Sequence, residues 1–488
     1  MKSINWNQQF NIPRLVKTDS YKAGHFTMYP DSEEMTAYIE ARKPFRDGED
    51  PRIVHFGINY FIDKYLSTPI THDDIDEALE FYKTHGVGST EYPFPEQLFR
   101  DIVNEENGHW PVVIRSLPDG SVVRARTPQV LITAKGKYAK LVTFLETSLL
   151  SCIWYMSTVA THSRLARQVI EDAFDKSTDE DAYWKISSRL HDFGYRGCTG
   201  EEQAMIGGAA HLLSFDGTDT MAAAWLTRQL LPKGEVNFDS SIPATEHSVM
   251  TSWDTELEAT LNMADKYGHT VFATVADSYD YNNFLWNIVP EIAPIVKEKG
   301  GFHVVRPDSG NPVTCVIDGL IALDHAYGSF ENSKGYRVIN NAGIIQGDGI
   351  GLDDIKTILE AVLKAGYSAE CVAFGMGAGL LQKLNRDTCS YAMKLCYRVT
   401  GDWLERPIMK APSTDMTKAS WPSVGQEFPG LESLPVIYSS GKVSSSEDFV
   451  TIRSRLDREW KDFQDKGHEV HFNELITYQQ KVYHTMEK

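Results

Sequence analysis

The stretch Phe302-His303-Val304-Val305-Arg306-Pro307-Asp308-Ser309-Gly310 joins a short apolar run to a polar loop that ends in glycine. The same combination recurs through the middle of the chain, and a helical pattern follows it each time. The other runs are Ile186–Leu190 before 191–197, Leu212–Phe215 before 216–219, Val271–Ala276 before Asp277-Ser278, Ile344–Gln346 before 347–349, and Val372–Phe374 before 375–379. We expect each run to form a short strand.

The segments between these runs carry helix signals. Thr199 and Glu202 have the spacing of a capping box, and the segment that opens at Asp353 places Ile355, Ile358, Leu359 and Val362 on one face. Strands that alternate with helices predict a parallel sheet. Because glycines and charged residues follow the strands, the pattern favours a (β/α) barrel with its site at the carboxyl ends of the strands. A doubly wound open sheet is the alternative.

The two flanks of this region have a different pattern. Residues up to about 150 mix helices with short strand-like runs such as Val112–Ile114 and Gln129–Thr133, and residues 413–435 are rich in Pro, Ser and Gly. We therefore predict an α/β protein in which an irregular (β/α) barrel, residues 151–389, is inserted into an α+β lobe. Residues 1–150 and 390–488 would form this lobe.

Composition excludes several classes of protein. Lys and Arg number 48 against 67 Asp and Glu, a net charge of −19, so a basic nucleic-acid-binding surface is not expected. The six cysteines include no C-x-x-C pair, which argues against a disulfide framework or a zinc ribbon. No apolar leader or spanning segment is visible, so we expect a cytoplasmic protein without a membrane partner. An anionic substrate would need a local cluster of Arg and Lys.

Two glycine-rich loops are candidates for phosphate binding. Residues 375–379 and 347–349 each lie between an expected strand and a helix, where backbone N–H groups favour an anion. Glycines also serve tight turns, so neither loop is diagnostic alone. Together they resemble the phosphate corner of barrel enzymes.

Charged residues at other strand ends extend the candidate site. Arg306 and Asp308 should project into it, although a structural ion pair would look the same. Asp277 and Asp308 could hold Mg²⁺ together with substrate oxygens. His247, judged by spacing alone, is more commonly a surface or core histidine than a catalyst. The loop with Phe193, Tyr195 and Arg196 suits ring stacking or anion binding, or simply core packing.

Eight ordered motifs between about residues 12 and 412 resemble the nicotinamide phosphoribosyltransferase family. They are Thr18–Lys22, His191–Gly197, Phe215–Thr220, Pro243–Ser248, Asp277–Asp280, Arg306–Pro312, Gln346–Gly349 and Leu380–Asp387. The resemblance implies transfer of a phosphoribosyl group from 5-phosphoribosyl 1-pyrophosphate to nicotinamide, giving nicotinamide mononucleotide and pyrophosphate in NAD salvage. It also implies a homodimer whose sites are composite, with the α+β lobe at the interface.

The resemblance also implies a role for each site residue. Phe193 and Tyr21 of the partner subunit would stack the pyridine ring, and Asp219 and Arg306 would read its carboxamide. Asp308, Gly347 and Asp348 would hold the ribose, Gly377 and Ala378 its 5′-phosphate. Arg42, Arg196, Arg386, Lys394 and Lys410 would surround the phosphates. His247 would be phosphorylated by ATP, and with Asp277, Asp308, Arg306 and Mg²⁺ it completes the expected catalytic set.

Three positions depart from the family pattern, and other functions stay open. Ala273, Ala378 and Ala392 each replace a residue that would supply a further polar or glycine contact, which puts substrate affinity and ATP coupling in question. The sibling alternative is nicotinate phosphoribosyltransferase, against which Asp219 argues because a carboxylate would repel the acid. A sugar-phosphate isomerase or aldolase barrel and a non-catalytic binding protein are more remote alternatives.

Overall fold

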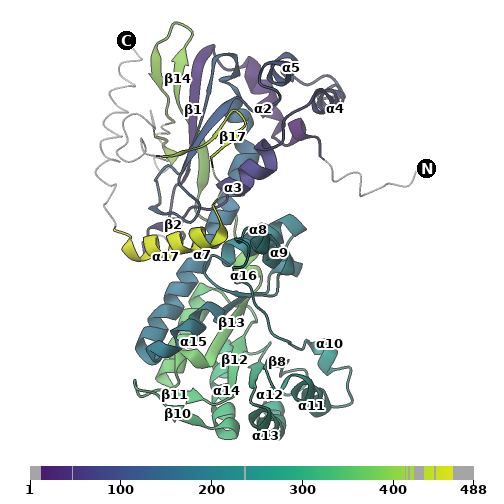
Figure 1. Cartoon of the computed structure of the whole chain (residues 1–488), viewed down its shortest axis with the longest axis vertical. Coiled ribbons are helices and arrows are strands. Elements are labelled where there is room, and N and C mark those ends of the chain that lie inside the picture. The colour runs from purple at the N-terminus through teal and green to yellow at the C-terminus, as the bar shows by residue number, and fades with distance from the viewer. Residues whose placement is uncertain are drawn as a thin grey trace, which may run out of the picture. The chain divides into compact units, whose positions relative to one another are not determined.

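The computed structural model divides into two compact units, and each is described by itself (Figure 1). It describes residues 12–46, 48–235, 238–410, 412, 414–415, 418–421, 434–444 and 447–464. The first unit is Met1–Thr158, Arg386–Glu447 and Ser454–Lys488, and the second is Val159–Asn385 and Asp448–Arg453. The predicted boundary at 150 differs because helix α7, Glu146–Ser177, passes through that residue without a break. No described helix is long and apolar enough to cross a membrane.

The second unit is built on a parallel sheet with the strand order β7-β6-β13-β12-β9-β8. The strands are β6 Leu190–Asp192, β7 Gly217–Thr218, β8 Val271–Val275, β9 Phe302–Arg306, β12 Ala342–Gln346 and β13 Val372–Met376. Residues 240–245 join its two edges, since Ser240 forms a parallel bridge with Gly217 and Ala244 forms one with Ala273. The sheet therefore curls into an irregular barrel, which confirms the predicted fold class.

On the strands, alternate side chains point into the barrel or toward the surrounding helices. Val304 of β9 lies in an apolar cluster with Ala273, Ile345 and Ala373 from three other strands. Its neighbour His303 points the other way, and its Nδ1 lies 3.0 Å from the Tyr327 hydroxyl of helix α14, Pro312–Tyr327. Helices α11, Glu256–Tyr267, and α13, Val289–Lys299, pack against β8 and β9 (Figure 1). Because the strands are parallel, their carboxyl ends lie at the same rim of the barrel.

Several local predictions are confirmed and others are wrong. Helix α15, Leu352–Lys364, buries the predicted face of Ile355, Ile358, Leu359 and Val362. The run 186–190 is mostly not a strand, because a 3₁₀ helix, Glu180–Ser188, precedes β6. The run 212–215 follows helix α8, Glu201–His211, as a buried turn before β7. Thr199 bonds the side chain of Gln203 instead of forming the predicted capping box with Glu202.

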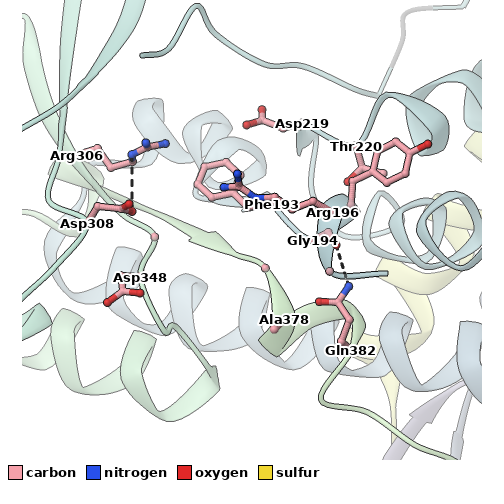
Figure 2. A pocket seen from close by; sticks show the side chains of 14 residues that line it. Phe193, Gly194, Arg196, Asp219, Thr220, Arg306, Asp308, Asp348, Ala378 and Gln382 are labelled. Atoms are coloured by element: carbon pink, nitrogen blue, oxygen red, sulfur yellow. Dashed lines mark hydrogen bonds and ion pairs between the residues drawn. The ribbon is translucent and has the colours of Figure 1, made fainter. Parts of the chain in front are cut away.

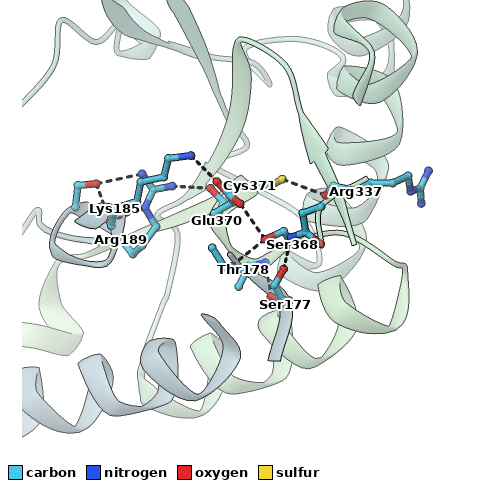
Figure 3. Close-up of polar contacts among 11 residues, drawn as sticks. Ser177, Thr178, Lys185, Arg189, Arg337, Ser368, Glu370 and Cys371 are labelled. Carbon is cyan, nitrogen blue, oxygen red and sulfur yellow. Dashed lines mark hydrogen bonds and ion pairs between the residues drawn. The ribbon is translucent and has the colours of Figure 1, made fainter. Parts of the chain in front are cut away.

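A polar network at the amino end of β13 ties this strand to the end of helix α7 (Figure 3). The Glu370 carboxylate accepts hydrogen bonds from Lys185 and, at 3.3 Å, from the Ser368 hydroxyl. Arg189 donates to the Glu370 carbonyl oxygen at 2.8 Å, and burial lowers the pKa of Arg189 to about 10. The Ser177 hydroxyl accepts the N–H of Ala369 at 2.9 Å. These bonds fix where β13 enters the barrel.

The first unit contains an antiparallel sheet with the order β15-β14-β1-β5-β3-β16-β17. The strands are β1 Ser32–Ala41, β3 Val112–Ser116, β5 Val130–Lys135, β14 Tyr391–Thr400, β15 Glu405–Pro407, β16 Val436–Ser439 and β17 Lys442–Val443. Strand β1 lies between β14 and β5, so the two ends of the chain build one α+β lobe, as predicted. Helices α4, His72–Tyr82, and α5, Glu96–Glu105, belong to this unit, and most of residues 413–435 lies outside the described residues.

A buried carboxylate on β1 anchors the segment that carries Lys410. Glu40 is fully buried, and it accepts hydrogen bonds from the Trp421 indole at 3.0 Å and from Arg126 at 3.4 Å. Ser420 next to Trp421 accepts the N–H of Lys410 at 2.6 Å and donates its own N–H to the Lys410 carbonyl at 2.9 Å. Burial raises the pKa of Glu40 to about 7, although Arg126 and Trp421 oppose the shift.

This pKa predicts a pH dependence of stability. Between the ordinary value of 4.5 and about 7 the folded protein holds a proton on Glu40 that the unfolded chain has released. The unfolding free energy should therefore fall as pH rises through this window. Relative to Glu40→Gln, the wild type should lose about 2–3 kcal/mol between about pH 5 and pH 8 in denaturant titrations. Glu77→Gln, at an exposed site on α4, serves as control, and an unchanged pH slope in Glu40→Gln would contradict the prediction.

Candidate active site

A pocket of about 510 Å³ lies at the carboxyl ends of the parallel strands (Figure 2). All its lining residues belong to the second unit. The predicted site residues that line it are Phe193, Arg196, Asp219, Arg306, Asp308, Gly347, Asp348, Gly377 and Ala378. Tyr195, already noted for its loop, also lines the pocket, as do Gly194, Gly197, Thr220 and Gln382, which the sequence analysis did not select.

The ring of Phe193 forms one surface of the pocket because a glycine of β13 and a glycine just after β12 lie beneath it. A Cβ at Gly375 would lie 1.9 Å from Cε2 of Phe193, and a Cβ at Gly347 would lie 3.2 Å from the same atom. The Phe193 N–H donates to the Met376 carbonyl at 3.1 Å, which holds the loop against β13. Gly375 is therefore required by the aromatic ring, and of the predicted phosphate loop 375–379 only Gly377 and Ala378 line the pocket.

Polar side chains surround this ring from neighbouring loops (Figure 2). The Ser241 hydroxyl donates to Asp219, which fixes one oxygen of that carboxylate. Arg306 donates to the Thr245 carbonyl at 3.3 Å, and its Nε lies 4.0 Å from Oδ1 of Asp308. The lining side chains comprise two arginines and three aspartates, so the pocket itself supplies no excess of positive charge.

His247 lies outside the lining but beside Asp308. It begins the short helix α10, His247–Met250, and its Nε2 lies 3.2 Å from Oδ1 of Asp277, while Nδ1 lies 3.8 Å from Oδ2 of Asp308. The other oxygen of Asp277 accepts the N–H of Asp308 at 3.1 Å and the Ser309 hydroxyl. For the neutral imidazole this geometry favours Nε2–H as the donor to Asp277 and leaves Nδ1 unprotonated. Asp277, and not the neighbouring Glu246, orients the ring.

The same contacts test the two expected metal ligands. Both oxygens of Asp277 already accept hydrogen bonds, and its side chain is only 6% exposed. Asp308 is 35% exposed and has only long ion-pair contacts, so it retains room for a cation. No group of three or more His, Cys, Asp or Glu that could hold a metal occurs among the described residues. Asp308 thus fits a magnesium ion that substrate oxygens also bind, whereas Asp277 fits a role in holding His247.

The remaining predicted cations lie in the first unit. Burial lowers the pKa of Lys394 on β14, and the nearby charges of Arg42, Lys410 and Lys22 lower it further. Arg42 donates to the Ser390 carbonyl at 2.9 Å. Lys22 pairs with Glu146 in this region. It was not among the predicted site residues, although it lies in the Thr18–Lys22 motif.

Two further predicted residues of the first unit are exposed. Tyr21 on helix α2, Ser20–Gly24, is 51% exposed, and Arg386 lies 3.2 Å from Asp387. Neither residue lines the pocket of the second unit. Their expected roles toward a substrate stay predictions.

Comparison with known proteins gives consistent matches. The family model described as the nicotinate phosphoribosyltransferase (NAPRTase) family matches residues 188–439, and the model of the nicotinamide phosphoribosyltransferase N-terminal domain matches residues 13–114. The nicotinamide phosphoribosyltransferase of Xanthomonas campestris pv. campestris (strain 8004) is 40% identical over 416 residues, 83% of this chain and 85% of that relative. That of Mycoplasma genitalium is 28% identical over 450 residues, 84% of this chain and 95% of the relative.

Two solved structures share the fold at low sequence identity. Human nicotinic acid phosphoribosyltransferase aligns with a TM-score of 0.57 and 15% identity, covering 92% of this chain and 94% of that one. Nicotinate-nucleotide pyrophosphorylase from Pyrococcus furiosus aligns with a TM-score of 0.58 and 13% identity, covering 95% and 98%.

The close approach of Phe193 to Gly375 predicts a sharp response to one methyl group. Gly375→Ala should push the ring from its place and lower the unfolding free energy by about 1–3 kcal/mol in denaturant titrations. Gly401→Ala, at an exposed turn, is the control, because a Cβ there meets nothing within 4 Å, and its effect should stay within about 0.5 kcal/mol. Equal stability of the two variants would contradict the packing described here.

Proposed function

The chain belongs to the nicotinate phosphoribosyltransferase family, and we propose that it transfers the phosphoribosyl group of 5-phosphoribosyl 1-pyrophosphate to nicotinamide. The products are nicotinamide mononucleotide and pyrophosphate. The observation that carries the proposal is a pocket in which one aromatic face, Phe193, lies together with Asp219 and Arg306. A flat pyridine ring with a carboxamide matches these three groups, and the 40% identical relative bears the name of this activity.

The reaction breaks the bond between C1 of ribose and pyrophosphate, and the pyridine nitrogen forms a new bond to C1. Positive charge develops on the sugar while negative charge develops on the leaving group. In our proposal Asp308, Asp348 and the backbone of Gly347, which line the same pocket, face the ribose. Gly377 and Ala378, at the start of helix α16, Ala378–Leu381, receive the 5′-phosphate. Mg²⁺, when bound, would neutralise part of the pyrophosphate charge.

We further propose a homodimer with composite sites. The pocket holds only Arg196 and Arg306 as cations, against three aspartates, whereas the donor substrate carries several phosphate charges. Arg42, Lys394 and Lys410 gather in the first unit, which supports a role for that unit in binding the phosphates. Tyr21 of the partner subunit would cover the second face of the pyridine ring, and Arg386 would reach the phosphates.

Asp219 supports the amide over the acid as acceptor. Its carboxylate can accept a hydrogen bond from a carboxamide NH₂, whereas a nicotinate carboxylate would place two anions together with no donor between them. Arg306 does not reverse this preference in our proposal, because Asp308 lies 4.0 Å from its Nε and already balances part of its charge. Nicotinate phosphoribosyl transfer is the competing outcome of the test.

The test compares both acceptors with the pyrophosphate donor and Mg²⁺ and measures mononucleotide and pyrophosphate by chromatography. We expect kcat/KM to favour nicotinamide by at least about tenfold, because nicotinate loses one hydrogen bond to the charged Asp219 carboxylate. Asp219→Asn should narrow this ratio, and Asp265→Asn on the exposed face of α11 is the control. Equal efficiency on the two acceptors would refute the amide preference, and the absence of pyrophosphate would refute transfer itself.

We also propose that ATP is a co-substrate that phosphorylates His247. Asp277 holds Nε2 at 3.2 Å, which leaves Nδ1 as the nitrogen that attacks the γ-phosphorus. The new N–P bond forms as the bond from phosphorus to the ADP oxygen breaks, and the Nε2 proton stays with the Asp277 hydrogen bond. The added anion would lie beside Asp308 and the magnesium ion, which would couple ATP hydrolysis to substrate binding.

Removal of the imidazole should separate the two reactions. His247→Ala should abolish the ATP stimulation of mononucleotide yield and the acid-labile phosphate on the protein, while slow transfer without ATP persists. This residual activity is expected because Asp308 and Arg306 remain in the pocket. His269→Ala, at an exposed site of the same unit, is the control. Undiminished ATP stimulation in His247→Ala would contradict the proposal.

A further inference from the structure

Asp192 is a buried acid that no step of the proposed reaction uses. It is the last residue of β6, it is fully buried, and its Oδ1 accepts the N–H of Gly194 at 2.7 Å. Its main-chain carbonyl accepts the N–H of Asp219 at 3.0 Å. One residue thus bonds both the loop that carries the Phe193 ring and the loop that carries the Asp219 carboxylate.

The surroundings of the Asp192 carboxylate leave it little freedom. A Cβ at Gly194 would lie 3.1 Å from Oδ1, and a Cβ at Gly208 of helix α8 would lie 2.9 Å from Oδ2. Oδ2 and the hydroxyl of Thr220 are both buried, and Thr220 lies close enough to interact with the Asp192 carboxylate. Thr220 also lines the pocket, so this carboxylate lies directly behind the pocket wall.

Burial of the Asp192 carboxyl group is unfavourable, so its presence here needs an explanation. Burial raises the pKa of Asp192 to about 6, while the Gly194 N–H and Thr220 oppose the shift and the nearby Asp219 adds to it. Burying a carboxylate costs stability, and an apolar residue of similar size would avoid that cost. What an apolar residue would not provide is the bond to Gly194, which closes the turn just after Phe193.

We propose that Asp192 is a positioning residue for the aromatic acceptor, holding the 193–195 turn at a set distance from the 219–220 loop. The inference rests on the proposed function, since it concerns how nicotinamide is held. A ring that stacks on Phe193 must at the same time bring its carboxamide within hydrogen-bond reach of Asp219. Displacements of about 1 Å between such groups are enough to weaken binding and rate strongly.

This role predicts that removal of the Asp192 carboxylate weakens the binding of nicotinamide more than that of the phosphoribosyl donor. Asp192→Ala should raise the KM for nicotinamide, and its Kd by calorimetry, about tenfold, as expected for one lost hydrogen bond to a charged acceptor. The KM for 5-phosphoribosyl 1-pyrophosphate should rise less, by no more than about threefold. Of the groups assigned to this substrate only Arg196 adjoins the 193–195 turn, whereas Asp308, Asp348 and the cations of the first unit lie on other segments. Asp192→Asn should restore the nicotinamide KM, because the Asn side-chain oxygen can accept the same Gly194 N–H.

Control variants distinguish a positioning role of Asp192 from a general loss of stability. Asp119→Ala removes a comparably buried carboxylate, which accepts the N–H groups of Gly57 and Ile58 in the first unit, and should leave both KM values unchanged. If Asp192→Ala does not fold, Asp192→Ser, which keeps a polar atom with a shorter reach, should show the same selective rise.

The outcomes distinguish this inference from the function on which it rests. A folded Asp192 variant with unchanged nicotinamide affinity, or one in which both KM values rise together, would overturn the role of Asp192. A wild-type protein that forms no mononucleotide would instead contradict the proposed function. The calorimetric nicotinamide affinities of wild type and variant still decide the role of Asp192 in that case.

Discussion

The contact between the Phe193 ring and the backbone of Gly375 is the constraint on which the pocket depends. The barrel interior below it is lined by small and branched apolar side chains, among them Ala273, Val304 and Ala373. A second cavity, of about 290 Å³, is lined in part by Val304, Ile345 and Ala373, whereas the charged groups of the first pocket lie at the rim. There a Cβ at Gly375 would lie 1.9 Å from the ring, so only glycine lets an aromatic side chain lie across the strand ends.

The side chains that line the pocket at the rim carry no net positive charge, so they do not by themselves form a complete site for an anionic substrate. The chain carries a net charge of −19, and the pocket lining adds three aspartates to two arginines. Cations gather in the first unit, where burial, and then the nearby charges of Arg42, Lys410 and Lys22, lower the pKa of Lys394. Glu146, which pairs with Lys22, offsets part of this repulsion. The remaining positive charge makes the cluster suited to an anion, which is consistent with the proposed role of these residues toward phosphates.

Some parts of this arrangement could be predicted from sequence, and others could not. Strands β9, β12 and β13 follow from apolar runs that end in glycine or charge, and helix α15 follows from its spacing. The prediction of a strand at 212–215 was wrong because a short apolar stretch suits a buried turn as well as a strand. Periodicity over four residues does not distinguish a turn from a strand. His247 and Asp277 lie 30 residues apart, and only the barrel closure through residues 240–245 makes them partners. Spacing therefore could not predict the orientation of His247.

The three residues that depart from the family pattern lie in different parts of the structure. Ala273 lies in the apolar cluster of the barrel interior, where a hydroxyl would meet Val304, Ile345 and Ala373 and no polar group of that cluster. Ala392 lies opposite Glu40 in the β1–β14 register and is not among the residues that line the pocket. Ala378 alone lines the pocket, at the first residue of helix α16, so a changed substrate contact is to be sought there. Because its backbone N–H remains available to an anion, the alanine adds a methyl group without removing the donor that a phosphate needs.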